Sequence, residues 1–425
     1  MRSGRLPLPD YLDRIEALFE EREPELLAFV PEPGRFERLR REAAALAARH
    51  PRPAGRPPLF GIALGVKDIF HLDGWPTRAG SRLPPAELGG PEAASARTLR
   101  RAGALVLGKT VTTEFAYFAP GPTRNPRHPG HTPGGSSSGS AAAVGAGLCP
   151  LALGSQTIGS IVRPAAYCGV VGFKPSYGRI ATAGVVPLAP SLDHVGVIAS
   201  EVAAARVAAS LLCRGWRPGA ARRRDRRRPM RLGIPAGPYL QRASAEALAS
   251  FGAACDRLAA AGFEVEAVPA LPDFEEVARR HLLLFAAEAA RVHASWYERH
   301  ARLYDARTAA LIERGRSAPA AEVAGARAGR ARLRRDLEAL MDRHRLDFWI
   351  SPSATGPAPR GLDSTGDPVM NLPWTYCGLP VLGLPAGESA GGLPLGLQVT
   401  ARFHGDERLL AWGSALESAC RGGAA

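Results

Sequence analysis

Lysine is almost absent from this sequence. Lys67, Lys109 and Lys174 are the only lysines among 54 basic residues, and all the others are arginine. Arginine stays protonated in proteins, whereas a buried lysine can lose its proton and act as a base. A sequence that uses arginine so widely keeps lysine where arginine cannot replace it. Each lysine is therefore a candidate base, and we expect at least one of them to transfer protons.

Cysteine and histidine occur without the spacing that metal sites require. No two of the six cysteines form a CxxC pair, and none of the ten histidines belongs to an HExxH motif. We therefore expect neither a metal nor another cofactor. Isolated cysteines are typical of reduced, packed positions in a core. The six cysteines are Cys149, Cys168, Cys213, Cys255, Cys377 and Cys420.

Long apolar runs are also missing. No stretch reaches the ~18 apolar residues that span a bilayer. The longest candidate, residues 141–154, is interrupted by Gly145, Gly147 and Pro150. The sequence reaches Asp10 without the apolar core of a secretory signal. We expect a cytoplasmic protein that has no membrane partner.

The net charge of +14 would suit a nucleic-acid partner, because basic surfaces attract phosphate. The arginines are nevertheless spread through the chain, and no nucleic-acid-binding motif accompanies them. The one dense run, residues 222–228, lies between Pro218 and Pro229 and is typical of a solvated loop. We expect no nucleic-acid partner.

The 425 residues, 46% of them hydrophobic, are sufficient for a large core. Short apolar segments alternate with helical periodicity, which indicates an α/β protein. We expect a helical segment over residues 1–55 and one domain over 56–425, with an arginine-rich loop at 214–229 and a helical, substrate-side insertion at 244–344. Strand-like segments on both sides of the loop favour one shared sheet. Residues 263–268 interrupt the helical insertion. The segments predicted as strands are 59–67, 104–107, 148–153, 170–173, 195–199, 232–234, 348–351 and 395–399.

Two short motifs are typical of other enzymes but have the wrong context. Residues 103–110 fit the phosphate-loop pattern GxxxxGK[ST], yet Gly103 follows a predicted helix and the intervening residues are apolar and strand-like. Residues 135–139 fit GxSxG, yet a loop precedes them instead of a strand. The adjacent Asp193 and His194 would point apart on a strand and could not easily complete a triad. We therefore disfavour both an NTPase and an α/β-hydrolase.

Two segments rich in serine and glycine flank the strand predicted at 148–153. Residues 134–140 read Gly-Gly-Ser-Ser-Ser-Gly-Ser, and in the second segment, 154–164, Ser160 follows Ser136 by 24 residues. Surface turns of this composition usually have polar neighbours, whereas these segments are flanked by Ala, Val, Leu and Ile. The flanks indicate buried hydroxyl and amide groups, which need partners.

These segments resemble the amidase signature family. The resemblance includes Lys67 in Gly-Val-Lys-Asp, the serine-rich segment with Ser136, and Ser160 in Gly-Ser-Ile, and it extends from about residue 57 to 410. It implies a single amidase-signature domain, an α/β fold with a central mixed β-sheet covered on both faces by helices. Supporting matches lie at 74–77, 107–110, 172–175 and 392–398.

By this resemblance, Ser160 is the acylated nucleophile, Ser136 the bridging serine in a cis peptide, and Lys67 the base. A neutral lysine, its pKa lowered by burial, would accept a proton from Ser136, which would accept one from Ser160. Four backbone N–H groups would form the oxyanion hole. They belong to Thr157, Ile158, Gly159 and Ser160. The expected reaction is hydrolysis of a small amide through an acyl-serine intermediate.

Departures from the family pattern concern the substrate. Gln156 and Ile158 replace the more common Asp and Gly. Arg163 falls three residues after the nucleophile, as in malonamidase-like members, and it is a candidate substrate-binding residue together with Gly135. A guanidinium in this apolar stretch needs an anion. That anion is either a carboxylate elsewhere in the fold, which would make Arg163 structural, or a carboxylate of the substrate.

Lys109 and Lys174 are expected to be structural, paired with backbone carbonyls or acidic groups.

The alternative function is the glutaminase component of a tRNA-dependent amidotransferase, which makes ammonia from glutamine for a tRNA-linked partner, although Gln156 and Ile158 favour a stand-alone amidase. A nucleic-acid-binding protein with a decayed amidase fold is disfavoured by the intact Lys-Ser-Ser set. The sequence leaves the oligomeric state, including a homodimer, open.

Overall fold

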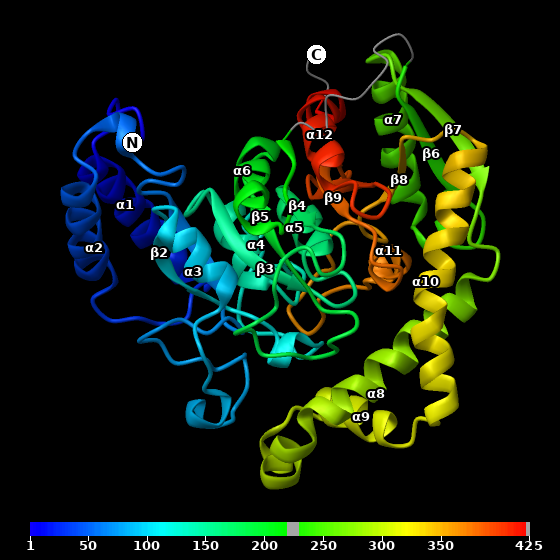
Figure 1. The fold of residues 1–425 in the computed structure, drawn as a ribbon, viewed down its shortest axis with the longest axis horizontal. Helices are drawn as coiled ribbons and strands as arrows, with labels where there is room; N and C mark the ends of the chain where they lie inside the picture. Colours follow the sequence, from blue (N-terminus) through cyan, green and yellow to red (C-terminus); the bar gives the residue numbers. More distant parts are fainter. Residues whose placement is uncertain (219–228, 422–425) are drawn as a thin grey trace.

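The computed structural model describes residues 1–218 and 229–421, so the arginine run at 222–228 lies outside the described residues. The described residues form one ten-stranded sheet (Figure 1). Its strands are β1 (Ala63–Lys67), β2 (Leu105–Thr110), β3 (Leu151–Gln156), β4 (Val171–Lys174), β5 (His194–Ala199), β6 (Arg231–Ala236), β7 (Glu264–Pro269), β8 (Phe348–Pro352), β9 (Val381–Glu388) and β10 (Pro394–Thr400). Their order in the sheet is β2-β1-β3-β5-β4-β9-β10-β8-β6-β7.

The sheet is mixed, as predicted. β1 lies parallel between β2 and β3, and β6 is parallel to β7 and β8. Between β3 and β8 in the sheet order, every pair of adjacent strands is antiparallel. Strands from both sides of the arginine-rich loop therefore belong to one sheet.

Helices cover both faces of this sheet. The α-helices of the described residues are α1 (Leu8–Leu26), α2 (Arg35–Arg49), α3 (Ala94–Arg101), α4 (Ser138–Gly145), α5 (Val162–Cys168), α6 (Val202–Leu212), α7 (Ala245–Ala260), α8 (Phe274–His300), α9 (Ala306–Arg316), α10 (Ala320–Arg343), α11 (Leu372–Tyr376) and α12 (Asp406–Cys420). In β2, Val106 joins a buried cluster with residues of α3, α6, α7 and α12. Its neighbours Leu105 and Leu107 join a second cluster with residues of α1, α2, α4 and α5. Because strand side chains alternate between faces, the strand contributes to both cores.

In Figure 1, α10 lies on the right of the view and α8 and α9 extend below the sheet, whereas α1 and α2 lie on the left. Together with α7 and β7, helices α8, α9 and α10 make up the segment predicted to be mostly helical, residues 244–344. Within the described ranges, none of the helices combines the length and the apolar character that a membrane crossing requires.

Two strands differ from the predictions in an informative way. β3 begins later than predicted and continues to Gln156, so Ser155 belongs to the strand and not to the following loop. The sequence pattern does not predict β9, because Gly383, Pro385 and Gly387 interrupt its apolar residues. Pro385 is accommodated in the sheet because the register of β9 and β10 shifts next to it.

The two motifs typical of other enzymes have the structures that their context predicts. Gly103, with a φ of 96°, follows α3, and the next residues form β2. Lys109 within that strand is buried and forms an ion pair with Asp68 at 2.9 Å, as expected for a structural lysine. Residues 135–139 run from a loop into α4, and on β5 the ring of His194 contacts the Leu192 carbonyl instead of a carboxylate.

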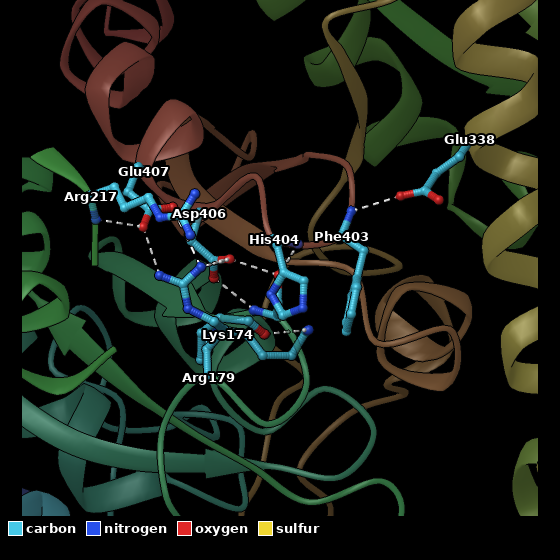
Figure 2. Close-up of polar contacts among 10 residues, drawn as sticks. Lys174, Arg179, Arg217, Glu338, Phe403, His404, Asp406 and Glu407 are labelled. Atoms are coloured by element: carbon cyan, nitrogen blue, oxygen red, sulfur yellow. Dashed lines mark hydrogen bonds and ion pairs between the residues drawn. The ribbon is translucent and has the colours of Figure 1, made fainter. Parts of the chain in front are cut away.

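Polar contacts at the start of α12 tie the end of β4 to the C-terminal part of the chain (Figure 2). Lys174 Nζ donates to the backbone carbonyls of Leu379 at 2.5 Å and of Pro175 at 3.2 Å, which is the structural role predicted for it. The Asp406 carboxylate accepts the backbone N–H and the hydroxyl of Ser176, both at 2.7 Å. Arg179 reaches the same carboxylate at 3.5 Å.

We expect Asp406→Ala to lower the free energy of unfolding by about 3 kcal/mol, because it leaves buried donors and part of the Arg179 charge without an acceptor. Chemical denaturation measures the change. The matched control is Asp342→Ala, which removes an exposed carboxylate from an ion pair with Arg402 and should alter stability far less. Equal losses in the two variants would contradict this assignment.

Candidate active site

The candidate site lies at the edge of the sheet where β1 and β3 end. These strands are parallel, and Val66 pairs with Leu153, so Lys67 at the end of β1 lies beside the end of β3. The segment 134–140 leads into α4, and residues 157–161 connect β3 to α5. The fold therefore brings the lysine and both serine-rich segments to one edge of the sheet.

Lys67 is fully buried and forms no ion pair with a carboxylate of the described residues. Its Nζ lies 2.8 Å from the Ser136 Oγ and 2.8 Å from the Ser155 Oγ. Burial lowers the pKa of Lys67 well below its usual value, and the through-space effect of Asp193 opposes this only in part. The surroundings therefore favour a neutral amine in contact with two hydroxyl groups.

The backbone around Ser136 is held from several sides. A cis peptide bond joins Gly135 to Ser136. The Gly135 carbonyl accepts the Arg163 Nη2–H at 2.7 Å, and the Ser136 carbonyl accepts the Thr113 N–H at 3.3 Å. Gly134 has a φ of 80°, and a Cβ there would lie 2.9 Å from the backbone of α5. Only glycine suits both this angle and this close approach.

Ser160 lies just before α5 and is 8% exposed. Within residues 1–218 and 229–421 its hydroxyl forms no hydrogen bond, so no structural partner occupies it. The backbone N–H groups of residues 157–160 also donate to no acceptor in the described part of the chain. The next two N–H groups, those of Ile161 and Val162, both donate to the Gln156 Oε1, at 2.8 and 3.0 Å. A serine hydroxyl beside unpaired amides is an arrangement that can stabilise an oxyanion.

Arg163 is buried in α5 and forms no ion pair with a carboxylate among the described residues, so the interpretation as half of a structural ion pair is wrong there. Besides the Gly135 carbonyl, its guanidinium donates to the Thr365 Oγ1 at 3.1 Å and to the Gly366 carbonyl. Its Nε–H has no acceptor within residues 1–218 and 229–421. Burial lowers the pKa of Arg163 to about 10, while Asp367 acts on it only through space.

Asp193 anchors the beginning of the loop that carries Ser160. Its carboxylate accepts the Thr157 hydroxyl at 2.7 Å and the backbone N–H groups of Leu188 and Ala189 at 2.9 and 3.0 Å. Burial raises the pKa of Asp193, and these three hydrogen bonds oppose the rise. Ser155, Thr157 and Asp193 line a cavity of about 60 Å³ whose other walls are mostly apolar.

Ser155 and Thr375 are among the residues of the site that were not identified from the sequence. Ser155 contacts Lys67 because β3 continues beyond its apolar residues. In the sequence, the one signal for this contact is that Ser155 directly precedes Gln156. Thr375 in α11 donates its hydroxyl to the Ile158 carbonyl at 2.6 Å. No pattern in the sequence connects Thr375 to a loop 217 residues away.

Comparisons with known proteins match nearly the whole chain to one family and one fold. The family model described as Amidase matches residues 11–410, which includes most of α1 and all of α2. The GatA-type component of the glutamyl-tRNA(Gln) amidotransferase of Synechococcus sp. (strain RCC307) is 30% identical, with 96% of this chain and 93% of the relative covered. The AtzE component of the 1-carboxybiuret hydrolase of Pseudomonas sp. (strain ADP) is 46% identical over 39% of this chain and 38% of its own. A crystal structure of an amidase superimposes with a TM-score of 0.86 at 32% identity, covering 98% of this chain and 96% of that chain.

Proposed function

The chain belongs to the amidase family, and we propose that it hydrolyses the C–N bond of a linear, non-peptide carboxylic acid amide through an acyl-serine intermediate on Ser160. Family membership and the likeness to a solved amidase make it an amide hydrolase. The observation that carries the proposed mechanism is the buried Lys67 amine, which has no carboxylate partner among the described residues and lies 2.8 Å from the Ser136 hydroxyl.

In the proposed relay, neutral Lys67 accepts the Ser136 proton as Ser136 accepts the Ser160 proton. The Ser160 oxygen bonds to the amide carbonyl carbon, the C–N bond breaks, and the relay returns a proton to the departing nitrogen. Water deprotonated by the same relay then cleaves the ester and releases the carboxylate. Catalytic hydrogen bonds often form fully only when substrate is bound, which is compatible with the unpaired Ser160 hydroxyl.

The backbone N–H groups of residues 157–160 have no acceptor in the described part of the chain, and this supports an oxyanion hole built from them. Negative charge develops on the carbonyl oxygen of the substrate when Ser160 attacks. N–H donors that have no other acceptor are available to that oxygen without breaking an existing bond. This leaves Gln156 to hold the two following amides, so that the loop keeps its shape as the charge appears.

As substrate class we favour amides that carry a carboxylate. A buried guanidinium with no carboxylate partner in the described chain is costly, and an anionic substrate group would compensate it. A relative named as part of a 1-carboxybiuret hydrolase gives independent support, since that name describes a carboxylated amide. Gly135 would contribute through its carbonyl, which helps to hold Arg163 in place.

The second candidate is the glutamine-hydrolysing component of a tRNA-dependent amidotransferase. It is favoured by 30% identity to a component of a glutamyl-tRNA(Gln) amidotransferase over nearly the whole of both chains. Ammonia release from glutamine that depends on co-purified partner proteins would support it. Ammonia release by the isolated chain from small carboxylated amides would support the stand-alone amidase.

Ser160→Ala should remove essentially all hydrolysis and leave the fold intact, because it deletes the attacking oxygen while the helices and strands keep their packing. A fluorophosphonate should modify wild-type protein at Ser160 alone. Peptide mapping by mass spectrometry checks the site of modification, and circular dichroism checks the fold. Modification of Ser137 in place of Ser160 would contradict this mechanism and would indicate that Ser137 is the nucleophile of a GxSxG motif.

Arg163→Lys should lower kcat/KM for carboxylate-bearing amides about a hundredfold more than for neutral amides, since a point charge cannot replace the planar guanidinium. Steady-state kinetics on matched amide pairs tests this. The control is Arg35→Lys, because Arg35 is also a buried arginine bonded to backbone carbonyls but lies outside the site. It should reduce stability without changing substrate preference. If both substrate classes fall together in Arg163→Lys, Arg163 does not recognise a carboxylate.

A further inference from the structure

A chain of hydrogen bonds runs from the loop before Ser160 to α11 and back. The Gln156 Oε1 accepts the N–H groups of Ile161 and Val162. The Gln156 Nε2 donates to the Thr375 Oγ1 at 2.9 Å, and the Thr375 hydroxyl donates to the Ile158 carbonyl at 2.6 Å. Gln156 and Thr375 are both fully buried, so water does not compete for these bonds.

The partners fix which atom of the Gln156 amide is which. Two backbone N–H groups can only be met by the amide oxygen, so the amide nitrogen must face Thr375. That nitrogen is a donor only, and the Thr375 oxygen must accept from it. A hydroxyl has one proton to give, and here it goes to the Ile158 carbonyl.

Holding the Ile158 carbonyl also fixes the direction of the Gly159 N–H. In a planar trans peptide the C=O of one residue and the N–H of the next point in opposite directions. The neighbouring peptide is fixed independently, because the Gly159 carbonyl accepts the Arg163 backbone N–H at 2.9 Å. Close contacts restrict the loop further, since a Cβ on Gly159 would lie 2.3 Å from the Asn371 Oδ1.

We propose that Thr375 is a positioning residue that aims the Gly159 N–H at the substrate oxyanion, and that Gln156 acts through it by directing the Thr375 hydroxyl proton to the Ile158 carbonyl. A carboxylate at position 156 would accept the two backbone N–H groups equally well. It would also accept the Thr375 proton, and the Ile158 carbonyl would lose its donor. The neutral amide is therefore functional here, because it leaves the hydroxyl proton available for the loop. The inference rests on the proposed oxyanion hole.

The test is the kinetics of Ser160 modification by a fluorophosphonate, whose P=O oxygen takes the place of the substrate carbonyl oxygen. Thr375→Val should lower the maximal rate of modification about a hundredfold, similar to the loss of one oxyanion donor, with little change in the apparent binding constant of the probe. Thr375→Ser keeps the hydroxyl and should restore most of the rate. If Thr375 had a purely structural role, Thr375→Val would change the apparent binding constant of the probe along with the maximal rate of modification.

Gln156→Glu distinguishes proton direction from a general effect of added charge. In the wild-type background it should slow modification strongly. In the Thr375→Val background, Gln156→Glu should lower the rate of modification much less, because the Thr375 hydroxyl on which position 156 acts is already absent. Equal losses in both backgrounds, or a wild-type rate in Thr375→Val, would overturn the inference.

Failure of this inference and failure of the proposed function give different results. If Ser160→Ala abolishes modification but Thr375→Val does not slow it, only the positioning role is refuted. If modification persists in Ser160→Ala, the proposed nucleophile itself is wrong. Thermal unfolding of each variant identifies any that lose rate because they fail to fold.

Discussion

Lys67 is buried without a carboxylate partner in the part of the chain that the structure describes, and the site depends on this constraint. Placing an ammonium ion in a protein interior is costly, so a lysine there either pairs with an anion or gives up its proton. Lys109 takes the first course through its ion pair with Asp68. Among the described residues, Lys67 has only the hydroxyl groups of Ser136 and Ser155 within hydrogen-bond distance, and this favours the neutral amine.

Lys174 clarifies why burial alone does not make a base. Burial lowers its pKa to about 7, yet its hydrogen-bond partners are the carbonyls of Leu379 and Pro175. Carbonyl oxygens only accept, so the amine must donate to them and gains no proton in return. The partners of Lys67 are hydroxyls, which can give a proton as well as accept a hydrogen bond. The difference in partner chemistry separates the proposed base from the two structural lysines.

The features that could be predicted from the sequence are those that depend on residues close to one another along the chain. The α/β class follows from periodicity, and the residues around 103–110 and 135–139 show that neither segment has the context its motif requires, whereas the mixed sheet was expected only from the resemblance to the amidase signature family. The contacts that hold the loop before Ser160 could not be predicted in this way. Thr375 reaches that loop and Gly366 reaches Arg163 in α5, each from more than 200 residues away, and only the packing of α11 and of the loop before it brings them there. The apolar pattern also ended β3 too early, which concealed Ser155.

The most direct test of the proposed relay is the protonation state of Lys67. Because the chain contains only three lysines, protein grown with lysine labelled with carbon-13 at Cε gives three signals, and Lys67→Arg identifies one of them by its loss. We predict that the Lys67 signal titrates well below the ordinary lysine pKa of ~10.4, and that the rate of amide hydrolysis rises with pH over the same range as the amine loses its proton. A Lys67 signal that stays protonated at the pH of full activity, or Lys67→Arg protein that keeps a substantial rate, would contradict the relay.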